Sequence, residues 1–370
     1  MKKRSIWSRL LRYVLIPLGI LLASLVIVTT GYILIQQQLT ARAVAITHPD
    51  GIQRLEQVTL GGYPQWISMR GEDPTAPVLL FLHGGPGASE MVPMRHHNQD
   101  LEKHFIVVNW DQRGTGKSYS PDIPPETMEL EQFIQDTLEL TRLLRDEFEQ
   151  DRIYLVGHSW GTIIGTPVAQ RHPEYYHAYV GIGQAVNFVE AEKISYQFTL
   201  DEAQRRQLDA AVEELEAIGP PPYSREEYHE KLAVQRKWLF RFGGEFYHET
   251  SNTRWLLDLA RLHLIAPEYT LGDVINFMRG NAFSGEMLWD TLLATDLPSQ
   301  VPALELPVYF FSGRHDYVTV FEKVEEYYNM LEAPSKELVW FEESAHSPNF
   351  EEPGRFQEEL LRVKEATYPR

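Results

Sequence analysis

A serine between two glycines is the clearest chemical signal in this sequence. Gly157-His-Ser159-Trp-Gly161 follows a short apolar run that begins at Arg152, and it precedes a helix-compatible stretch that ends at Gln170. A strand, a sharp turn and a helix in this order form a nucleophile elbow, which exposes the serine hydroxyl at its apex. Small residues are needed on both sides because the backbone there is strained and neighbouring chain passes close by. The pattern therefore predicts that Ser159 is a nucleophile.

A nucleophilic serine needs a base and a group that orients the base. After an elbow of this kind the acid comes next in the chain and the histidine last, each on a loop that follows a strand. Asp316 follows the expected strand Leu306–Phe311, and His346 follows the expected strand Lys336–Phe341. We therefore expect Ser159, Asp316 and His346 to form a catalytic triad.

The attacked carbonyl group also needs hydrogen-bond donors for its developing negative charge. The backbone N–H of Trp160, directly after the serine, is one expected donor. The other should come from the loop His83-Gly-Gly-Pro-Gly87, which follows the apolar run Pro77–Leu82. Glycine lets the main chain approach a substrate closely, and proline stiffens such a loop. The sequence leaves open whether Gly84 or Gly85 donates.

Three other features could be mistaken for sites. Gly114-Thr-Gly-Lys-Ser118 hints at a phosphate-binding loop, but that motif needs a glycine where this chain has Asp111. His96 and His97 have no nearby partners at metal-ligand spacing, and no His-Glu-x-x-His occurs. His315 precedes Asp316 on the acid's own loop, so we assign it a supporting role at most. We expect neither a metal nor a cofactor.

Composition excludes several classes of function. The chain has 370 residues, 43% of them hydrophobic, which is enough for one large globular domain with an insertion. A formal net charge of −18 argues against a nucleic-acid partner. The absence of cysteine excludes disulfides, thiolate nucleophiles and zinc-thiolate sites.

Strand-like and helix-like stretches alternate along most of the chain. Helices are expected over Glu126–Glu149, Phe321–Met330 and Gly354–Glu365. The remaining runs of strand length, beyond those that precede the site residues, are Arg54–Leu60, Pro64–Met69, Phe105–Trp110 and Tyr179–Ala185. This alternation predicts an α/β fold with a mostly parallel sheet that is covered by helices on both faces.

Residues 187–304 follow a different pattern. Charged helical stretches at Leu200–Ile218, Glu226–Phe242 and Thr253–Leu264 occur there without strand-like runs. We interpret this region as a helical cap inserted between two parts of the α/β core, residues 53–186 and 305–370.

The N-terminus has the pattern of a membrane anchor. Residues 13–35 are apolar and uncharged, and residues 1–12 before them carry five cations: Lys2, Lys3, Arg4, Arg9 and Arg12. As a helix the run would span roughly 34 Å, enough for a hydrocarbon core of about 30 Å. The cations place the N-terminus in the cytoplasm, so the catalytic domain, joined by a tether over residues 36–52, would lie outside it. A cleaved secretory signal is the alternative, because Ala41-Arg-Ala43 resembles a cleavage site, although such signals have an apolar core of about 7–15 residues.

Three motifs, together with Asp316 and His346, resemble the proline iminopeptidase family of α/β-hydrolases. The motifs are His83-Gly-Gly-Pro-Gly87, Asp111-Gln-Arg-Gly-Thr-Gly-Lys-Ser118 and Gly157-His-Ser-Trp-Gly161. The likeness covers roughly residues 50–370. It implies an eight-stranded α/β-hydrolase fold with a helical cap over the site. It also implies removal of an N-terminal residue, often proline, from peptides through an acyl-enzyme.

The same resemblance points to substrate-binding residues in the cap. In this family, cap glutamates hold the free amino group of the substrate, and one of them directly follows a tryptophan-rich helix. Here Trp238 is followed by Leu239, and the nearest acid downstream is Glu245. The segment Asn276–Phe283, where a second such glutamate would be expected, contains none. Glu245 and Trp238 are therefore the candidate substrate-binding residues.

Other functions compatible with the same residues stay open. One is an esterase, lactonase or amidase with the same triad, whose cap aromatics bind an apolar group: Tyr196, Phe198, Trp238, Phe240, Phe242 and Trp255. Another is a non-catalytic receptor or scaffold, which the intact set of reacting groups disfavours. The expected partners are thus a small peptide or ester substrate and, through the N-terminal helix, a membrane.

Overall fold

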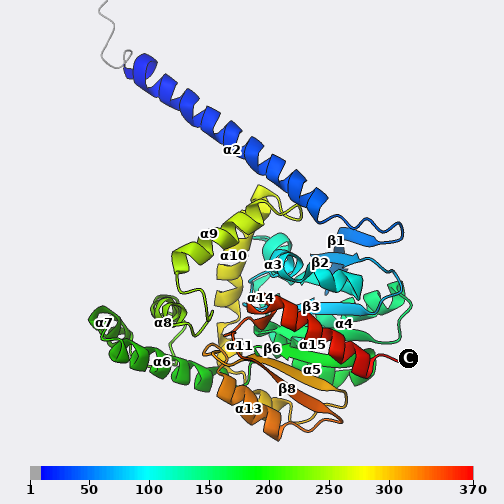
Figure 1. Cartoon of the computed structure of the whole chain (residues 1–370). Coiled ribbons are helices and arrows are strands. Elements are labelled where there is room, and N and C mark those ends of the chain that lie inside the picture. The colour runs from blue at the N-terminus through cyan, green and yellow to red at the C-terminus, as the bar shows by residue number, and fades with distance from the viewer. Residues whose placement is uncertain (1–9, 370) are drawn as a thin grey trace, which may run out of the picture.

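The computed structural model describes residues 10–369, which form a layered α/β body with one long helix that projects from it (Figure 1). Its sheet has eight strands in the order β1-β2-β4-β3-β5-β6-β7-β8. β2 pairs antiparallel with β1 and β4, and every other neighbouring pair is parallel, so the expected mostly parallel sheet is confirmed. The strands are β1 (Ile52–Leu60), β2 (Tyr63–Gly71), β3 (Val78–Leu82), β4 (Ile106–Asp111), β5 (Ile153–His158), β6 (Tyr176–Ile182), β7 (Val308–Gly313) and β8 (Lys336–Phe341).

Helices cover both faces of the sheet, which explains why the central strands are apolar throughout. In β3, Leu80 and Leu82 belong to one hydrophobic cluster and Leu79 and Phe81 to the other, as the two-residue repeat of a strand requires. The first cluster is covered by α4 (Leu130–Glu147), α5 (Trp160–Arg171) and α13 (Phe321–Met330). The second is covered by α3 (Met91–Asn98) and α15 (Pro353–Thr367).

The helices between β6 and β7 extend to one side of the sheet (Figure 1). The sequence predicted one helix over Leu200–Ile218, but the structure breaks it, because Gln207 adopts a φ of 56°. Sequence analysis also missed α10, whose three glycines lower helix propensity although a Thr270–Asp273 capping box starts it. The elements are α6 (Phe188–Arg205), α7 (Asp209–Ile218), α8 (Tyr228–Phe242), α9 (Asn252–Leu264), α10 (Leu271–Met287), α11 (Trp289–Leu293) and α12 (Leu297–Gln300).

The N-terminal apolar run is helical. A π-helical turn, Leu11–Leu15, leads into α2 (Ile16–Ala43), none of whose residues is buried. It is the one helix in the described part of the chain that is long and apolar enough to cross a membrane, a test that a secretory signal also passes. The helix continues to Ala43, so the first part of the expected tether, residues 36–52, is helical. The cations at positions 2–9 lie outside the described residues.

The remaining elements are short and lie between the larger ones. They are α14 (Pro348–Glu351) and the 3-10 turns Gln99–Lys103, Gly116–Ser118, Pro125–Thr127 and Pro173–Tyr175. Of these, α14 matters for the site because it follows His346 directly.

Candidate active site

Ser159 has the geometry of a nucleophile elbow. It lies between β5 and α5 with a φ of 52° and a ψ of −115°, and its N–H donates to the carbonyl oxygen of Ile182 at 2.9 Å. A Cβ on Gly157 would lie 2.6 Å from the carbonyl oxygen of Gly161, and one on Gly161 would overlap the carbonyl oxygen of Leu82. Both flanking glycines are therefore required by close approach of the backbone, as the sequence pattern predicted.

Asp316 and His346 form a buried pair on the loops after β7 and β8. His346 Nδ1 lies 3.0 Å from Asp316 Oδ2. The carboxylate also accepts from the N–H groups of Val318 and Thr319 and from the Thr319 hydroxyl. Burial alone would raise the pKa of Asp316, but the charge of His346 and these donors hold it below its usual value. An ionised Asp316 keeps the imidazole proton on Nδ1 and leaves Nε2 as the basic nitrogen.

The end of β6 brings the serine and the histidine together. The N–H of Ser159 binds Ile182, and a Cβ on the next residue, Gly183, would lie 3.0 Å from both Nδ1 and Cε1 of His346. Within residues 10–369 no hydrogen bond joins Ser159 Oγ to His346 Nε2. Catalytic hydrogen bonds of this kind are often long in a protein without substrate. The three residues expected in the triad thus gather at one edge of the sheet.

The loop after β3 lies directly against the serine. A Cβ on Gly84 would lie 3.3 Å from the Cβ of Ser159, and Gly85 has a φ of 119°, which favours glycine. Trp160 is the first residue of α5, so its N–H has no partner within the helix. The expected donors, Trp160 with Gly84 or Gly85, therefore lie beside Ser159.

Gln112, which sequence reasoning missed, joins the two donor segments. Its Oε1 accepts from Trp160 Nε1 at 3.0 Å, its Nε2 donates to the carbonyl oxygen of His83 at 3.2 Å, and its N–H donates to His83 Nε2 at 3.2 Å. Gln112 is buried. The sequence signal that could have identified Gln112 is its place in the motif Asp111–Ser118, directly after the buried strand β4.

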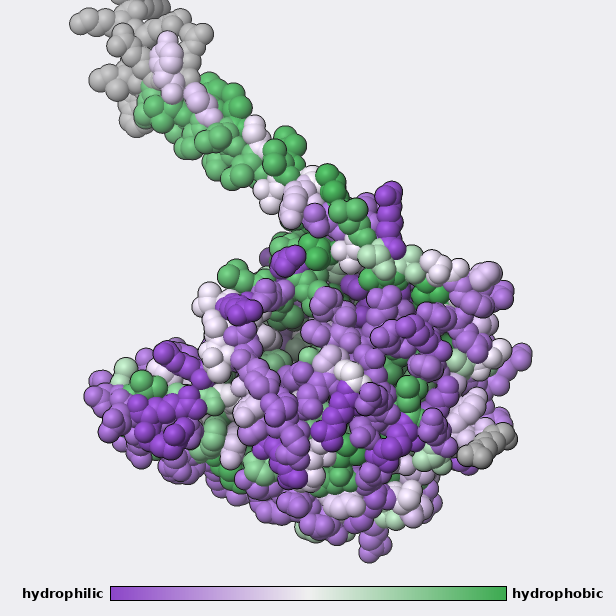
Figure 2. Space-filling model, in the orientation of Figure 1, coloured by the Kyte–Doolittle hydropathy of each residue, from purple (hydrophilic) through white to green (hydrophobic). Residues whose placement is uncertain are grey.

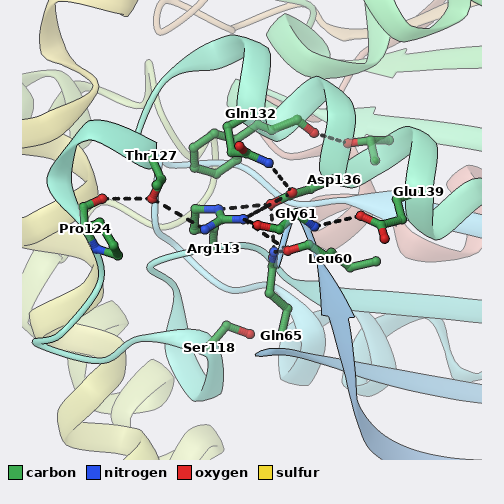
Figure 3. A network of polar contacts seen from close by, with 12 residues as sticks. Leu60, Gly61, Gln65, Arg113, Ser118, Pro124, Thr127, Gln132, Asp136 and Glu139 are labelled. Atoms are coloured by element: carbon green, nitrogen blue, oxygen red, sulfur yellow. Dashed lines mark hydrogen bonds and ion pairs between the residues drawn. The ribbon is translucent and has the colours of Figure 1, made fainter. Parts of the chain in front are cut away.

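The rest of that motif holds the loop in place. The Arg113 guanidinium forms a buried ion pair with Asp136 of α4 and donates to the carbonyl oxygens of Leu60 and Gly61 (Figure 3). Figure 3 shows these groups converging from the β1–β2 turn, from α4 and from the motif itself. Because the Arg113 side chain is 1% exposed and its pair Asp136 0%, this network packs the fold and does not reach substrate.

Asp111 links the same motif to the cap. It is fully buried and accepts from the backbone N–H of Lys117 at 2.8 Å, from the Tyr269 hydroxyl at 2.7 Å and from the Ser89 hydroxyl. Burial raises the pKa of Asp111 to about 6. Tyr269 lies between α9 and α10, so this carboxyl group fastens the cap to the core.

Glu351 of α14 and His158 support the His346 loop. Glu351 Oε1 accepts from the N–H groups of Ala345 and Ser347, on either side of the histidine. His158 Nε2 lies 3.0 Å from the carbonyl oxygen of His346, and its Nδ1 lies 2.6 Å from Glu90 Oε1. Burial lowers the pKa of His158, but Glu90, the carbonyl group of His346 and Asp316 together outweigh burial and raise it. The residue before the nucleophile therefore braces the base.

The two candidate substrate-binding residues of the cap lie in different places. The carbonyl oxygen of Glu245 accepts from the His346 N–H at 3.0 Å, and burial raises the pKa of its carboxyl group although Arg236 and His346 oppose this. Trp238 instead packs in the core of the cap beside Phe242 and donates from Nε1 to Glu214. The structure thus brings Glu245 to the triad and keeps Trp238 in the packing of the cap.

His315 and the other histidines that could suggest a metal site do not belong to the Asp316–His346 pair. His315 stacks on the ring of Tyr247, with 3.7 Å between ring centroids. In the described part of the chain, no three histidine, aspartate or glutamate side chains gather where they could hold a metal ion.

Known proteins are similar to this chain in sequence. A model of the alpha/beta hydrolase fold matches residues 77–218. The chain is 35% identical to probable aminopeptidase YbaC of Bacillus subtilis, over 86% of this chain and 98% of that one. It is 26% identical to a proline iminopeptidase of Heyndrickxia coagulans, over 75% of this chain and 87% of that one.

Solved structures are similar over most of their length. A proline iminopeptidase of Mycobacterium smegmatis has a TM-score of 0.62 at 18% identity and covers 85% of this chain and 98% of its own. A membrane phospholipase A has a TM-score of 0.64 at 19% identity and covers 96% of this chain and 98% of its own. At such identities these two likenesses show the fold alone. The sequence relatives, above all the one 35% identical over nearly its whole length, establish that the chain belongs to the proline iminopeptidase family of α/β-hydrolases.

Proposed function

We propose that this α/β-hydrolase is a membrane-anchored serine aminopeptidase of the proline iminopeptidase type, which removes N-terminal residues from short peptides. The observation that carries the proposal is the buried Asp316–His346 pair beside the elbow serine, Ser159. The names of the two sequence relatives, an aminopeptidase and a proline iminopeptidase, support the choice of peptide as substrate.

The mechanism follows from the proposed roles of these residues. Ser159 Oγ attacks the carbonyl carbon of the first residue while its proton passes to His346 Nε2, and Asp316 stabilises the resulting imidazolium. The N–H groups of Trp160 and of Gly84 or Gly85 stabilise the oxyanion. Collapse of the intermediate breaks the peptide bond, and the leaving amine takes the proton from His346. Water then attacks the acyl-enzyme with His346 as base, which releases the N-terminal residue and restores Ser159.

Glu245 is the proposed partner of the substrate ammonium group. It is joined to His346 through its backbone, and an ammonium group beside its carboxylate would offset the cost of burial that raises its pKa. Glu192 and Arg236 form an ion pair in the same part of the cap, so the Glu192 charge is already compensated. Trp238 acts on this site only through the packing of the cap.

An esterase with the same triad is the second candidate. Because Arg236 compensates Glu192, Glu245 is the acid left to bind an amine, whereas an ester substrate needs none. This alternative keeps Ser159, Asp316 and His346 in the same roles and changes only the group that the cap recognises.

Two substrates and one variant separate these candidates. The full-length protein, purified in detergent, would be assayed with a prolyl arylamide and with a short p-nitrophenyl ester, after a fluorophosphonate probe has confirmed a reactive Ser159. We expect the arylamide to be preferred, and Glu245→Gln to raise its KM at least tenfold with little effect on the ester. Glu214→Gln, which alters an exposed cap carboxylate away from His346, is the matched control. Unchanged arylamide kinetics in Glu245→Gln, with the ester preferred, would favour the esterase.

The proposed organisation places residues 1–12 in the cytoplasm, residues 13–35 in the membrane and the catalytic domain outside the cytoplasm. That domain consists of core residues 53–186 and 305–370, with the cap, residues 187–304, inserted between them. The apolar helix α2, whose one charged residue is Arg42 in its last turn, supports the membrane anchor in this proposal. The mass of the mature protein and its sensitivity to protease added outside intact cells would test it: an intact mass with external cleavage is expected, and a mass that lacks the first 43 residues would indicate a cleaved signal.

A further inference from the structure

Two cap helices expose large hydrophobic side chains that nothing in the described part of the chain covers. On α10, Leu271, Ile275 and Met278 lie at spacings of four and three residues, so they share one face of the helix. Ile275 is 52% exposed and Met278 72%. On α9, Leu256 and Leu257 are 56% and 65% exposed. We call these five residues the apolar cap face.

The apolar cap face belongs to helices that meet the end of the membrane helix. Gln37 of α2 donates from Nε2 to the carbonyl oxygens of Leu264, at 3.0 Å, and Tyr269, at 2.9 Å. These carbonyl groups flank the turn between α9 and α10. Gln37 comes just after Ile35, the last residue of the proposed span, so the turn is held where the chain leaves the membrane.

The pictures place the turn between α9 and α10 at the anchor end of the molecule. Figure 1 shows α9 leading away from the end of α2, with α10 starting at the same turn. In Figure 2 hydrophobic surface on α2 continues onto the body directly beneath it. Exposed apolar clusters on soluble domains commonly mark a membrane or protein contact, and this one adjoins the helix proposed above to span the membrane.

Cations lie near the apolar cap face, although Asp258, Asp273 and Glu286 balance them in the charge of α9 and α10. Arg254, Arg261 and Arg279 lie on the same two helices and are exposed, although the chain as a whole carries −18. Arg254 is 3.6 Å from Glu249 and 3.8 Å from Asp258, whereas Arg261 and Arg279 form no ion pair within residues 10–369. Cations beside an apolar helix face are the pattern of helices that lie in a membrane interface.

We propose that the apolar cap face lies in the boundary between headgroups and acyl chains of the membrane that α2 anchors. The proposal rests on the membrane anchoring put forward above and extends it from the anchor to the cap. It means that the cap is held both by the core, through contacts such as that of Tyr269 with Asp111, and by the lipid surface.

The absence of cysteine from the chain allows a direct test with single-cysteine variants. Leu257→Cys and Met278→Cys would be labelled with an environment-sensitive fluorophore in the full-length protein, which would be placed one chain per nanodisc. The discs would contain phosphatidylcholine and phosphatidylglycerol, alone or with one of two spin-labelled lipids: one carries the quencher near its headgroup, for positions 257, 278 and 330, and the other carries it deep in an acyl chain, for position 25. Met330→Cys is the matched control, because Met330 is 63% exposed on α13, at the opposite end of the body (Figure 1). Leu25→Cys, within α2, reports the anchor itself.

We expect the spin-labelled lipid to quench the probes at positions 257 and 278 at least twofold more than the probe at position 330. Adding Ile275→Glu to the Met278→Cys variant should at least halve the quenching at position 278. If position 25 is quenched but positions 257 and 278 behave like 330, the anchor stands and the proposal fails. If position 25 is not quenched either, the anchoring itself fails. The fluorescence at position 257 or 278 could instead shift to the blue only with two chains per disc, without being quenched by the spin-labelled lipid. That result would show that a second copy of the chain covers the face, and it would also overturn the proposal.

Discussion

The carboxyl edge of the sheet and the α9–α10 part of the cap are built in opposite ways. At the sheet edge, Gly157, Gly161 and Gly313 have no room for a Cβ, and Asp111 and Gln112 are fully buried. In contrast, the buried residues of α9 and α10 are His263, Gly280 and Ser284. The first region is held by dense packing and the second by a few polar contacts.

If the proposed function holds, the first region sets the chemistry and the second sets the specificity. A triad and its oxyanion donors need positions fixed to a fraction of an ångström, and close-packed backbone supplies that. A cap that is joined to the core by groups such as Tyr269 can instead shift to admit substrate. We therefore expect changes at the sheet edge to have large effects on rate or stability, and changes in α9 and α10 to act mainly on binding.

The largest expected effect is that of Ser159→Ala. Loss of the proposed nucleophile should lower kcat by at least about 10⁴-fold, because acyl-enzyme formation becomes impossible. Hydrolysis of the prolyl arylamide and of the p-nitrophenyl ester would both be measured. Ser299→Ala, which removes an exposed hydroxyl on α12, is the control and should keep full activity. Retention of more than a tenth of the activity in Ser159→Ala would mean that the sheet edge does not hold the reacting group.

Gly313→Ala should be the most destabilising small change. Its Cβ would overlap the carbonyl oxygen of Ala345, beside His346, and backbone cannot move aside without displacing the histidine loop. We expect a loss of about 3 kcal/mol or more in the free energy of unfolding, measured by denaturant titration in detergent. Gly354→Ala makes the same chemical change in α15, where nothing lies within 4 Å, and should change stability by at most about 1 kcal/mol. Equal losses in the two variants would show that the packing at position 313 is not tight.

The contact between cap and core should depend on pH through Asp111. Its pKa is raised from 3.8 to about 6 by burial, so between these values the unfolded chain releases the proton and the folded chain keeps it. Rising pH therefore favours unfolding across this window, by up to about 3 kcal/mol, with no further change above it. The Asp111→Asn variant has no carboxyl group to ionise at this position. The free energy of unfolding of the unsubstituted protein should therefore fall relative to that of the variant from pH 4 to pH 6. A constant difference between the two unfolding curves would contradict the assignment.

Gln112→Leu should reduce the rate with a smaller effect on stability. It removes the hydrogen bonds that hold Trp160 and the His83 loop together, so the proposed oxyanion donors lose alignment. We expect kcat to fall about 10- to 100-fold with KM nearly unchanged, since the donors act on charge that develops in the transition state. Gln197→Leu, on the exposed surface of α6, is the control. A rise in KM alone would show that Gln112 acts on substrate binding.

Much of the sheet could be predicted from the sequence because buried strands appear in it as short, continuous apolar runs. The range Lys336–Phe341 is found as predicted in β8, and Phe321–Met330 as predicted in α13. In the cap, the expected helices Glu226–Phe242 and Thr253–Leu264 are found as α8 and α9, but other parts of the prediction were wrong. There α10 was missed, and a single helix was expected where Gln207 breaks the chain.

The sequence by itself determined the residue types and the order of the reacting groups: an elbow serine, then an acid, then a histidine, each after a strand. It could do so because glycine spacing and apolar runs are local properties. Only the tertiary structure decided which distant groups meet. Gln112 bridges Trp160 and His83, Gln37 reaches the turn between α9 and α10, and Trp238 turns into the cap. Such contacts depend on how elements far apart in the chain pack together, and no short stretch of sequence carries that information.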